Sequence, residues 1–419
     1  MTHMTYKSII PILTGLLVAG SLLQAQETKL VDETFLSAVR TEATRNHPAA
    51  SSGKLRAAAA GRDIRAVRLW DDPMVGLTLM AARDSMRADD GDIRLSYEQP
   101  LPKPGLYQAN LAKAQAVQRA ELENSRSSSL EVGTAAAKDA IELALVDESI
   151  ALQAGQLKWF DSMAENARQM ARNPDANSID ALRLESELAR ENQILAAARR
   201  TRDSVSRRLN LRLGRPLELP WPVLRLATHS APVPIAGAEI ARIPRVNPKV
   251  RSMREMATAA SAETRIADRE RLPQFAVAVD ANLYSGGDVR SVGLGLKMSL
   301  PYFNRVSNDA KIDASKFREK AAVSDTEATR LAVASSVLTA TTDAANAAAQ
   351  ARAYSGEIYQ RALQATQAVE GAWISSKSSL TDLLDSNRML FSIRLEQRRF
   401  VAMQLAALED LNLLVPNPR

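Results

Sequence analysis

The chain has no cysteine, only three histidines among its 419 residues, and aromatic residues at 4% of positions. The absence of cysteine excludes disulfides, thiolate metal sites, a cysteine nucleophile and a lipid-modified cysteine. His3, His47 and His229 are far apart and lack the neighbouring ligands that a metal site needs, so we expect no metal and no cofactor. No phosphate-binding loop or nucleophile elbow is present either, and we therefore expect no enzymatic activity.

The composition that remains favours helices. Alanine, arginine, glutamate, leucine and serine are abundant and glycine is scarce, which is typical of long helices rather than a compact mixed core. The formal net charge is +6, but acidic and basic residues alternate along the whole chain. This interspersion indicates solvated helix faces, and we expect no nucleic-acid binding.

Residues 1–25 have the pattern of a signal peptide. Lys7 precedes the apolar run Ser8–Leu23, and Leu23-Gln24-Ala25 is a suitable cleavage site before Gln26. An uncleaved anchor helix is the alternative, but a run of about 16 residues is short for a membrane span. No later segment is apolar for long enough to form a transmembrane helix, so we predict an exported protein.

The stretch from Val292 to Leu300 alternates strictly between two kinds of side chain. Valine, leucine and methionine occupy one set of positions, and glycine, lysine and serine occupy the other, which predicts a strand with one apolar and one polar face. Its length suits a tilted strand that crosses a bilayer. Similar alternation elsewhere predicts three more strands, at about 74–80, 93–98 and 275–284, in addition to this one at about 291–300. Lys297 and the glycines beside it suit a water-filled lumen, or alternatively the outer face of a soluble sheet.

Long segments without proline predict the helices. They span Gly105–Asn173, Ser178–Leu213, Asn308–Gly371 and a last helix from Leu380, and an earlier helical segment, Glu33–Leu69, is interrupted at Pro48. Asn46-His47-Pro48 is echoed by Asn247-Pro248, and each predicted hairpin is flanked by prolines about 200 residues apart. The chain therefore reads as a tandem duplication. The predicted boundaries are 26–214 for the first repeat, 215–235 for a proline-rich linker, 236–413 for the second repeat and 414–419 for a tail.

Four strands are too few to close a sheet on themselves. A membrane sheet must close because lipid cannot satisfy open strand edges, and the smallest barrels have about eight strands. Several copies of the chain must therefore share one barrel.

Two motifs carry a family resemblance. SLPYFNR at 299–305 follows the alternating strand, and LTDLLDS at 380–386 follows a helix and a turn. Together with the duplicated layout, they resemble the TolC-type outer-membrane efflux family, closest in loop and chain length to its heavy-metal branch. The resemblance implies a mainly α fold with a membrane β part: a homotrimer with a twelve-stranded barrel in the outer membrane and a periplasmic α-barrel. It also implies partners, namely a periplasmic adaptor, an inner-membrane pump and outer-membrane lipid.

The resemblance also implies the site residues. Acidic residues at the positions of Asp382 and Asp385 form rings at the periplasmic entrance in this family, where they attract cations. For Asp382 an alternative is helix capping, because Ser379 lies three residues before it. Adaptor contacts at the helix tips correspond to Lys377, Ser376 and Asn173, although Ser376 stands where the family often has glycine.

The predicted function is a passive outer-membrane channel of a tripartite, RND-type efflux system. It would pass solutes, heavy-metal cations among them, from pump and adaptor to the exterior. The alternative from the residues is a soluble periplasmic coiled-coil scaffold or adaptor.

Overall fold

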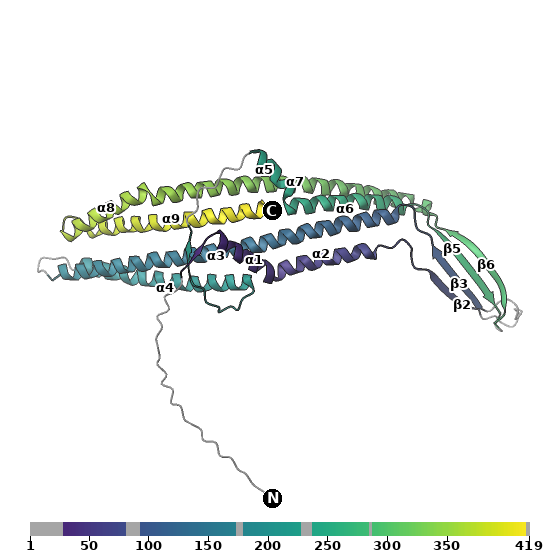
Figure 1. The fold of residues 1–419 in the computed structure, drawn as a ribbon, viewed down its shortest axis with the longest axis horizontal. Coiled ribbons are helices and arrows are strands. Elements are labelled where there is room, and N and C mark those ends of the chain that lie inside the picture. Colours follow the sequence, from purple (N-terminus) through teal and green to yellow (C-terminus); the bar gives the residue numbers. More distant parts are fainter. Residues whose placement is uncertain (1–27, 81–92, 173–178, 228–236, 285–286, 416–419) are drawn as a thin grey trace, which may run out of the picture.

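The computed structural model describes residues 28–80, 93–172, 179–227, 237–284 and 287–415. Long helices run side by side along an elongated molecule, a curved sheet forms one end, and helical hairpins form the other (Figure 1). The mainly helical fold with a small β part confirms the predicted class. None of the helices within the described residues is both long and apolar enough to span a bilayer. The predicted signal peptide, residues 1–25, lies outside the described residues.

Within the described residues, the first half of the chain contains four helices and a hairpin. Their bounds are α1 Glu33–Asn46, α2 Pro48–Ala66, β2 Met74–Leu79, β3 Ile93–Pro100, α3 Leu106–Met170 and α4 Ile179–Leu213. The predicted interruption at Pro48 is confirmed: the His47 imidazole accepts a hydrogen bond from the Ala49 N–H at 3.2 Å, and Pro48 begins α2. Proline suits this first helical position because its missing N–H has no helical partner there.

The second half has a similar order of elements, with one more helix and a short 3₁₀ turn. It contains α5 Gly237–Val246, α6 Pro248–Glu270, β5 Phe275–Leu283, β6 Val289–Met298, the short 3₁₀ turn η1 Pro301–Asn304, α7 Arg305–Ser355, α8 Glu357–Ile374 and α9 Leu380–Leu414. One contact recurs in both halves. The Asn46 amide donates to the Leu213 carbonyl at 3.0 Å, and the Asn247 amide donates to the Leu414 carbonyl at 3.0 Å. Each asparagine therefore ties the start of its half to the end of that half's last helix.

One expectation about these elements was wrong. The segment Asn308–Gly371 is not one helix, because Gly356 separates α7 from α8 with a non-helical backbone (φ −98°, ψ −122°). Glycine has the lowest helix propensity after proline, which lowers the cost of a break there. The predicted linker, 215–235, also holds an element that was not expected: strand β4 Val223–Leu226, which pairs in parallel with β1 Thr28–Val31.

The small β1–β4 sheet is held on α3 by two carboxylates. The Leu224 N–H donates to Asp147 at 2.8 Å, and the Leu226 N–H donates to Glu148 at 2.9 Å. Asp147 is buried and also pairs with Arg202 of α4. Buried apolar side chains of α1, α3, α4, β4 and α9 surround this sheet and form the largest core cluster. The middle of the molecule is thus fixed by contacts between distant segments.

The second sheet has the strand order β2-β3-β5-β6, with every neighbouring pair antiparallel. The four predicted strands are confirmed. Strands β3 and β5 join the two hairpins in the centre, so β2 and β6 are its edges. Within the described residues each edge strand has a neighbour on one side only.

Candidate functional site

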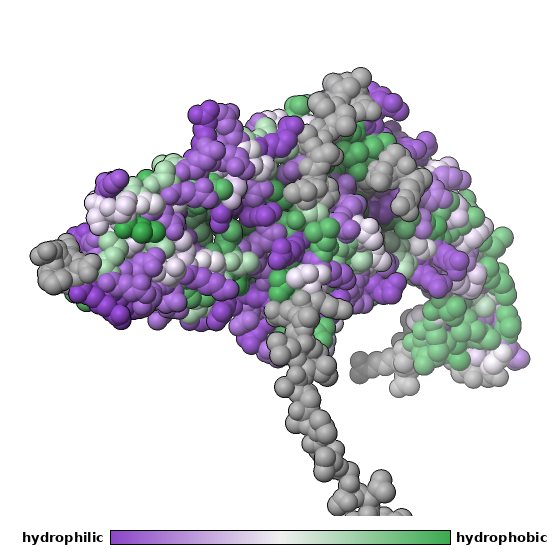
Figure 2. Space-filling model, turned by 60° about the vertical axis from the view of Figure 1, so that its left-hand side comes forward, coloured by the Kyte–Doolittle hydropathy of each residue, from purple (hydrophilic) through white to green (hydrophobic). Residues whose placement is uncertain are grey.

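One face of the four-stranded sheet is apolar and exposed. Val75, Tyr97, Val279 and Leu294 lie directly opposite one another across the four strands. Leu294 is 81% exposed and Val75 is 77% exposed. Figure 2 shows apolar side chains gathered over the sheet, whereas hydrophilic residues cover much of the helical surface. Large exposed apolar patches mark contacts with lipid or with other proteins.

The opposite face is polar and internally bonded. The Lys297 ammonium pairs with Glu98 at 2.5 Å, and the Arg94 guanidinium donates to Asn282 at 3.0 Å. Asn282 in turn donates to the Ser291 hydroxyl at 3.0 Å. The predicted separation of Lys297 from the apolar face is therefore confirmed. The sheet has the two-sided character of a wall between lipid and water.

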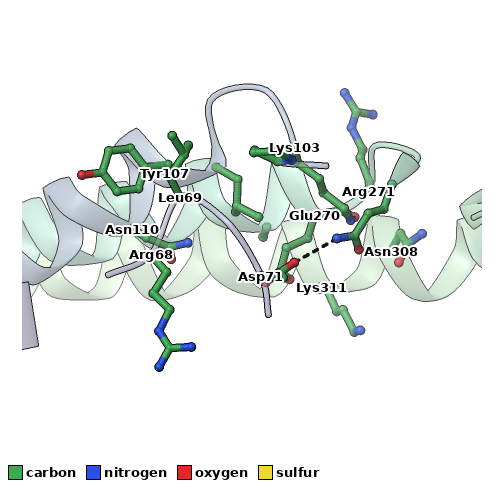
Figure 3. Close-up of a pocket in the computed structure, with 14 residues that line it drawn as sticks. Arg68, Leu69, Asp71, Lys103, Tyr107, Asn110, Glu270, Arg271, Asn308 and Lys311 are labelled. Carbon is green, nitrogen blue, oxygen red and sulfur yellow. Dashed lines mark hydrogen bonds between the residues drawn. The ribbon is translucent and has the colours of Figure 1, made fainter. Parts of the chain in front are cut away.

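A polar cavity of about 430 Å³ lies where the sheet meets the helices. Residues from the segment between α2 and β2, from the end of α6 and from the starts of α3 and α7 line it (Figure 3). The Gln274 amide donates to Asp71 at 3.0 Å, and the Lys103 ammonium donates to the Glu270 carbonyl at 2.7 Å. Gln274 continues the polar face of the sheet, since the next residue but one, Ala276, lies opposite Lys297. The polar face therefore extends into the helical part.

At the other end of the molecule, Asp382 caps α9. The Asp382 N–H donates to the Ser379 hydroxyl at 3.1 Å, and the Ser379 N–H and hydroxyl donate to the Asp382 carboxylate at 3.2 and 2.7 Å. These bonds, the one from the Ser379 hydroxyl first, lower the pKa of Asp382. The capping box predicted as the alternative role of Asp382 is therefore present.

Asp385 lies one turn further along α9 and has no capping role. Its carboxylate is 70% exposed and lies 3.8 Å from the Arg388 guanidinium. Asp382 is exposed as well. Both predicted gate residues thus carry their carboxylates at the surface of the helix tip, where they can meet solutes or other copies of the chain.

The turn between α8 and α9 contains the predicted tip residues Ser376 and Lys377. Ser376 has a left-handed backbone (φ 59°), the only non-glycine residue in the described part of the chain with a positive φ. Glycine adopts this conformation at least cost, which explains why the family often has glycine here. The Lys377 N–H closes the turn on the Ala372 carbonyl at 2.8 Å. The third predicted tip residue, Asn173, lies outside the described residues.

The contacts between the two helical hairpins were not predicted. The Gln156 amide of α3 donates to Asn387 of α9, the Trp159 indole N–H donates to Glu370 of α8 at 3.4 Å, and Arg388 pairs with Glu187 of α4 at 2.8 Å. Arg388 and Glu187 are 201 residues apart, about the offset of the predicted duplication. Opposite charges at equivalent positions of the predicted repeats were the one sequence signal that could have indicated this pair.

Comparisons with known proteins agree with this geometry. Residues 243–415 match the family model described as outer membrane efflux protein. The fold is similar to that of the outer-membrane channel OprN (TM-score 0.78, 15% identity, covering 93% of this chain and 91% of that chain). It is also similar to CusC (0.77, 14%, 91% and 91%) and to the outer membrane protein VceC from Vibrio cholerae (0.76, 14%, 91% and 96%). No curated protein sequence matches the chain. The family match and the shared fold confirm the predicted resemblance.

Proposed function

We propose that this chain, which matches the outer membrane efflux family over residues 243–415 and shares the fold of its channels, forms the wall of a passive channel in the bacterial outer membrane. The observation that carries the proposal is the four-stranded sheet with one exposed apolar face, one polar face and two open edges. Such a sheet is stable in lipid only when its edges are paired. Copies of the chain satisfy this need when β6 of one copy pairs with β2 of the next, and a homotrimer gives twelve strands.

The helices next to the edge strands support the same assembly. α2 leads into β2, and α7 follows β6, so edge pairing brings α7 of one copy beside α2 of the next. Both helices expose large apolar side chains: Leu55 of α2 is 68% exposed, Phe317 of α7 is 69% exposed, and Leu331 and Leu338 are more than half exposed. Neighbouring copies would cover these side chains in a helical tube on the periplasmic side.

The helix tips are then the periplasmic entrance. Asp382 and Asp385 of three copies would place six carboxylates around it and attract cations. Lys377, Ser376 and Asn173 at the tips would contact a periplasmic adaptor that connects the channel to an inner-membrane pump of the RND type. Heavy-metal cations are the substrate class that we propose for such an acidic entrance. The matching asparagine bonds of the two halves support a tandem duplication with repeats at 26–214 and 236–413, a linker at 215–235 and a tail at 414–419.

The test is the state of the protein in cells. Export with cleavage after residue 25, an outer-membrane fraction that contains a trimer band dissociating only on heating, and ion-conducting pores in planar bilayers are expected. A soluble periplasmic monomer without pore activity would instead support the scaffold alternative and overturn the channel.

A further inference from the structure

A cavity of about 350 Å³ lies at the junction of the two helical hairpins. α3 of the first hairpin forms one wall, and α8 and α9 of the second form the others. The size and the position between packed helices are those of small-molecule sites. Gly155 of α3 lies on its wall at an exposed position, and a Cβ added there would meet no atom within 4 Å. The cavity is therefore open at Gly155.

The apolar part of the wall comes from all three helices. Trp159 of α3, Leu363 of α8 and Phe391 of α9 line the cavity, together with Leu390, which is 7% exposed. Trp159 is held by an edge-to-face contact with Phe160, with ring centroids 5.1 Å apart. The site therefore presents a fixed indole ring and aliphatic side chains to an apolar or aromatic ligand.

One charge in this cavity lacks a counterion. Among the described residues, the Glu370 carboxylate has a single hydrogen bond, the 3.4 Å contact from the Trp159 indole, and no ion pair. The cavity's cation, Arg394, is already engaged, because its guanidinium donates to the Tyr359 hydroxyl at 2.9 Å and lies over the Tyr359 ring at 5.3 Å. A half-buried carboxylate at the N–H edge of an indole ring attracts an organic cation by charge, and the neighbouring ring face can add a cation–π contact.

We propose that this cavity binds a small amphipathic organic cation. Its ammonium group would lie on Glu370 and against Trp159, and its apolar body would fill the space beside Gly155. A bound ligand contacts both hairpins, so it adds to the apolar cluster and the polar bonds that already join them. The site would consequently resist separation of the helix tips.

The experiment uses the full-length assembled protein and 4-phenylbutylammonium as the probe. A saturable change in tryptophan emission is expected, with an affinity about tenfold higher than that of 4-phenylbutanol, which has the same body without the charge. 4-Phenylbutyrate should bind more weakly still. Equal affinities for the three probes, or a change that does not saturate, would overturn the proposal.

Three variants locate the binding site. Trp159→Phe should abolish the emission change, and Glu370→Gln should weaken the cation about tenfold while leaving the neutral probe unaffected. Gly155→Leu should abolish binding by filling the cavity. The matched control is Gly371→Leu in α8, where an added Cβ also meets no atom within 4 Å and which does not line the cavity. Equal loss of binding in both glycine variants would overturn the assignment.

A bilayer measurement separates this inference from the channel proposal, on which the conductance effect rests. The cation should lower conductance in the parent protein and not in Gly155→Leu. If the protein binds the cation but forms no pore, the channel proposal is wrong and the proposed ligand site is retained. A conducting pore that shows no binding would overturn the site alone.

Discussion

The two ends of the molecule bury their apolar side chains to different extents. At the sheet end apolar side chains stay exposed on the single chain, as Leu294 does at 81%. Near the tip a cluster of them is buried within the chain, where Trp373 is 2% exposed and packs with Phe160 and Leu383, although Ile374 stays 51% exposed. The tip therefore has a core of its own, whereas the proposed channel would complete the sheet with lipid and other copies of the chain.

The largest expected effect comes from removing the core of the tip. Trp373→Ala should destabilise the hairpin ends by about 3–5 kcal/mol, the usual cost of emptying a buried aromatic position. The measure is the rate of trypsin cleavage near the tip. Trp70→Ala at the sheet end is the control, because Trp70 is 52% exposed and its loss should leave tip cleavage unchanged. If the Trp373→Ala variant resists trypsin cleavage near the tip as well as the parent protein does, the tip is not stabilised by its own core.

The next effect tests the sheet. Leu294→Lys puts a charge on the apolar face and should cost about 2–4 kcal/mol in a membrane barrel, seen as loss of the heat-dissociable trimer from the outer-membrane fraction. Gly293→Lys, one residue away, points to the polar face, where an added side chain meets only the Asp280 carbonyl at 4.0 Å. It should assemble normally. If both variants assemble equally well, the apolar face does not contact lipid.

A smaller effect concerns charge at the tip. The double variant Asp382→Ala with Asp385→Ala should raise single-channel conductance and weaken block by multivalent cations, because the entrance loses its carboxylates. Ser379→Ala separates the charge from the cap, since it removes the capping hydroxyl at a cost of about 1 kcal/mol and keeps both carboxylates. Unchanged conductance and block in the double variant would leave Asp382 with the capping role alone.

The smallest expected effect is a change in the pH midpoint of cation block. Hydrogen bonds from Ser379 lower the pKa of Asp382, so the stabilisation from this group is present above its unfolded pKa and is lost as pH falls through the folded value. Cation block by Asp382 should accordingly persist to a lower pH than an ordinary aspartate allows. In Ser379→Ala the midpoint should move to higher pH. A midpoint that does not move would show that other groups control the block.

The sequence by itself determined the local features. The two faces of the strands, the interruption at Pro48 and the capping box of Asp382 depend on residues within a few positions of one another, so alternation, proline and Ser-x-x-Asp spacing were sufficient to predict them. The same signals did not predict the break at Gly356, because one glycine in a long helix is compatible with either outcome.

Only the tertiary structure decided the contacts between distant segments. The pairing of β1 with β4 joins residues such as Val31 and Leu226, and the junction cavity brings Gly155 to Glu370 and Phe391. Such contacts depend on how whole helices pack, and each single residue there is compatible with a solvated surface. The physical reason is that a local pattern specifies which face of an element is apolar, whereas the partner of that face is fixed by the packing of the entire chain.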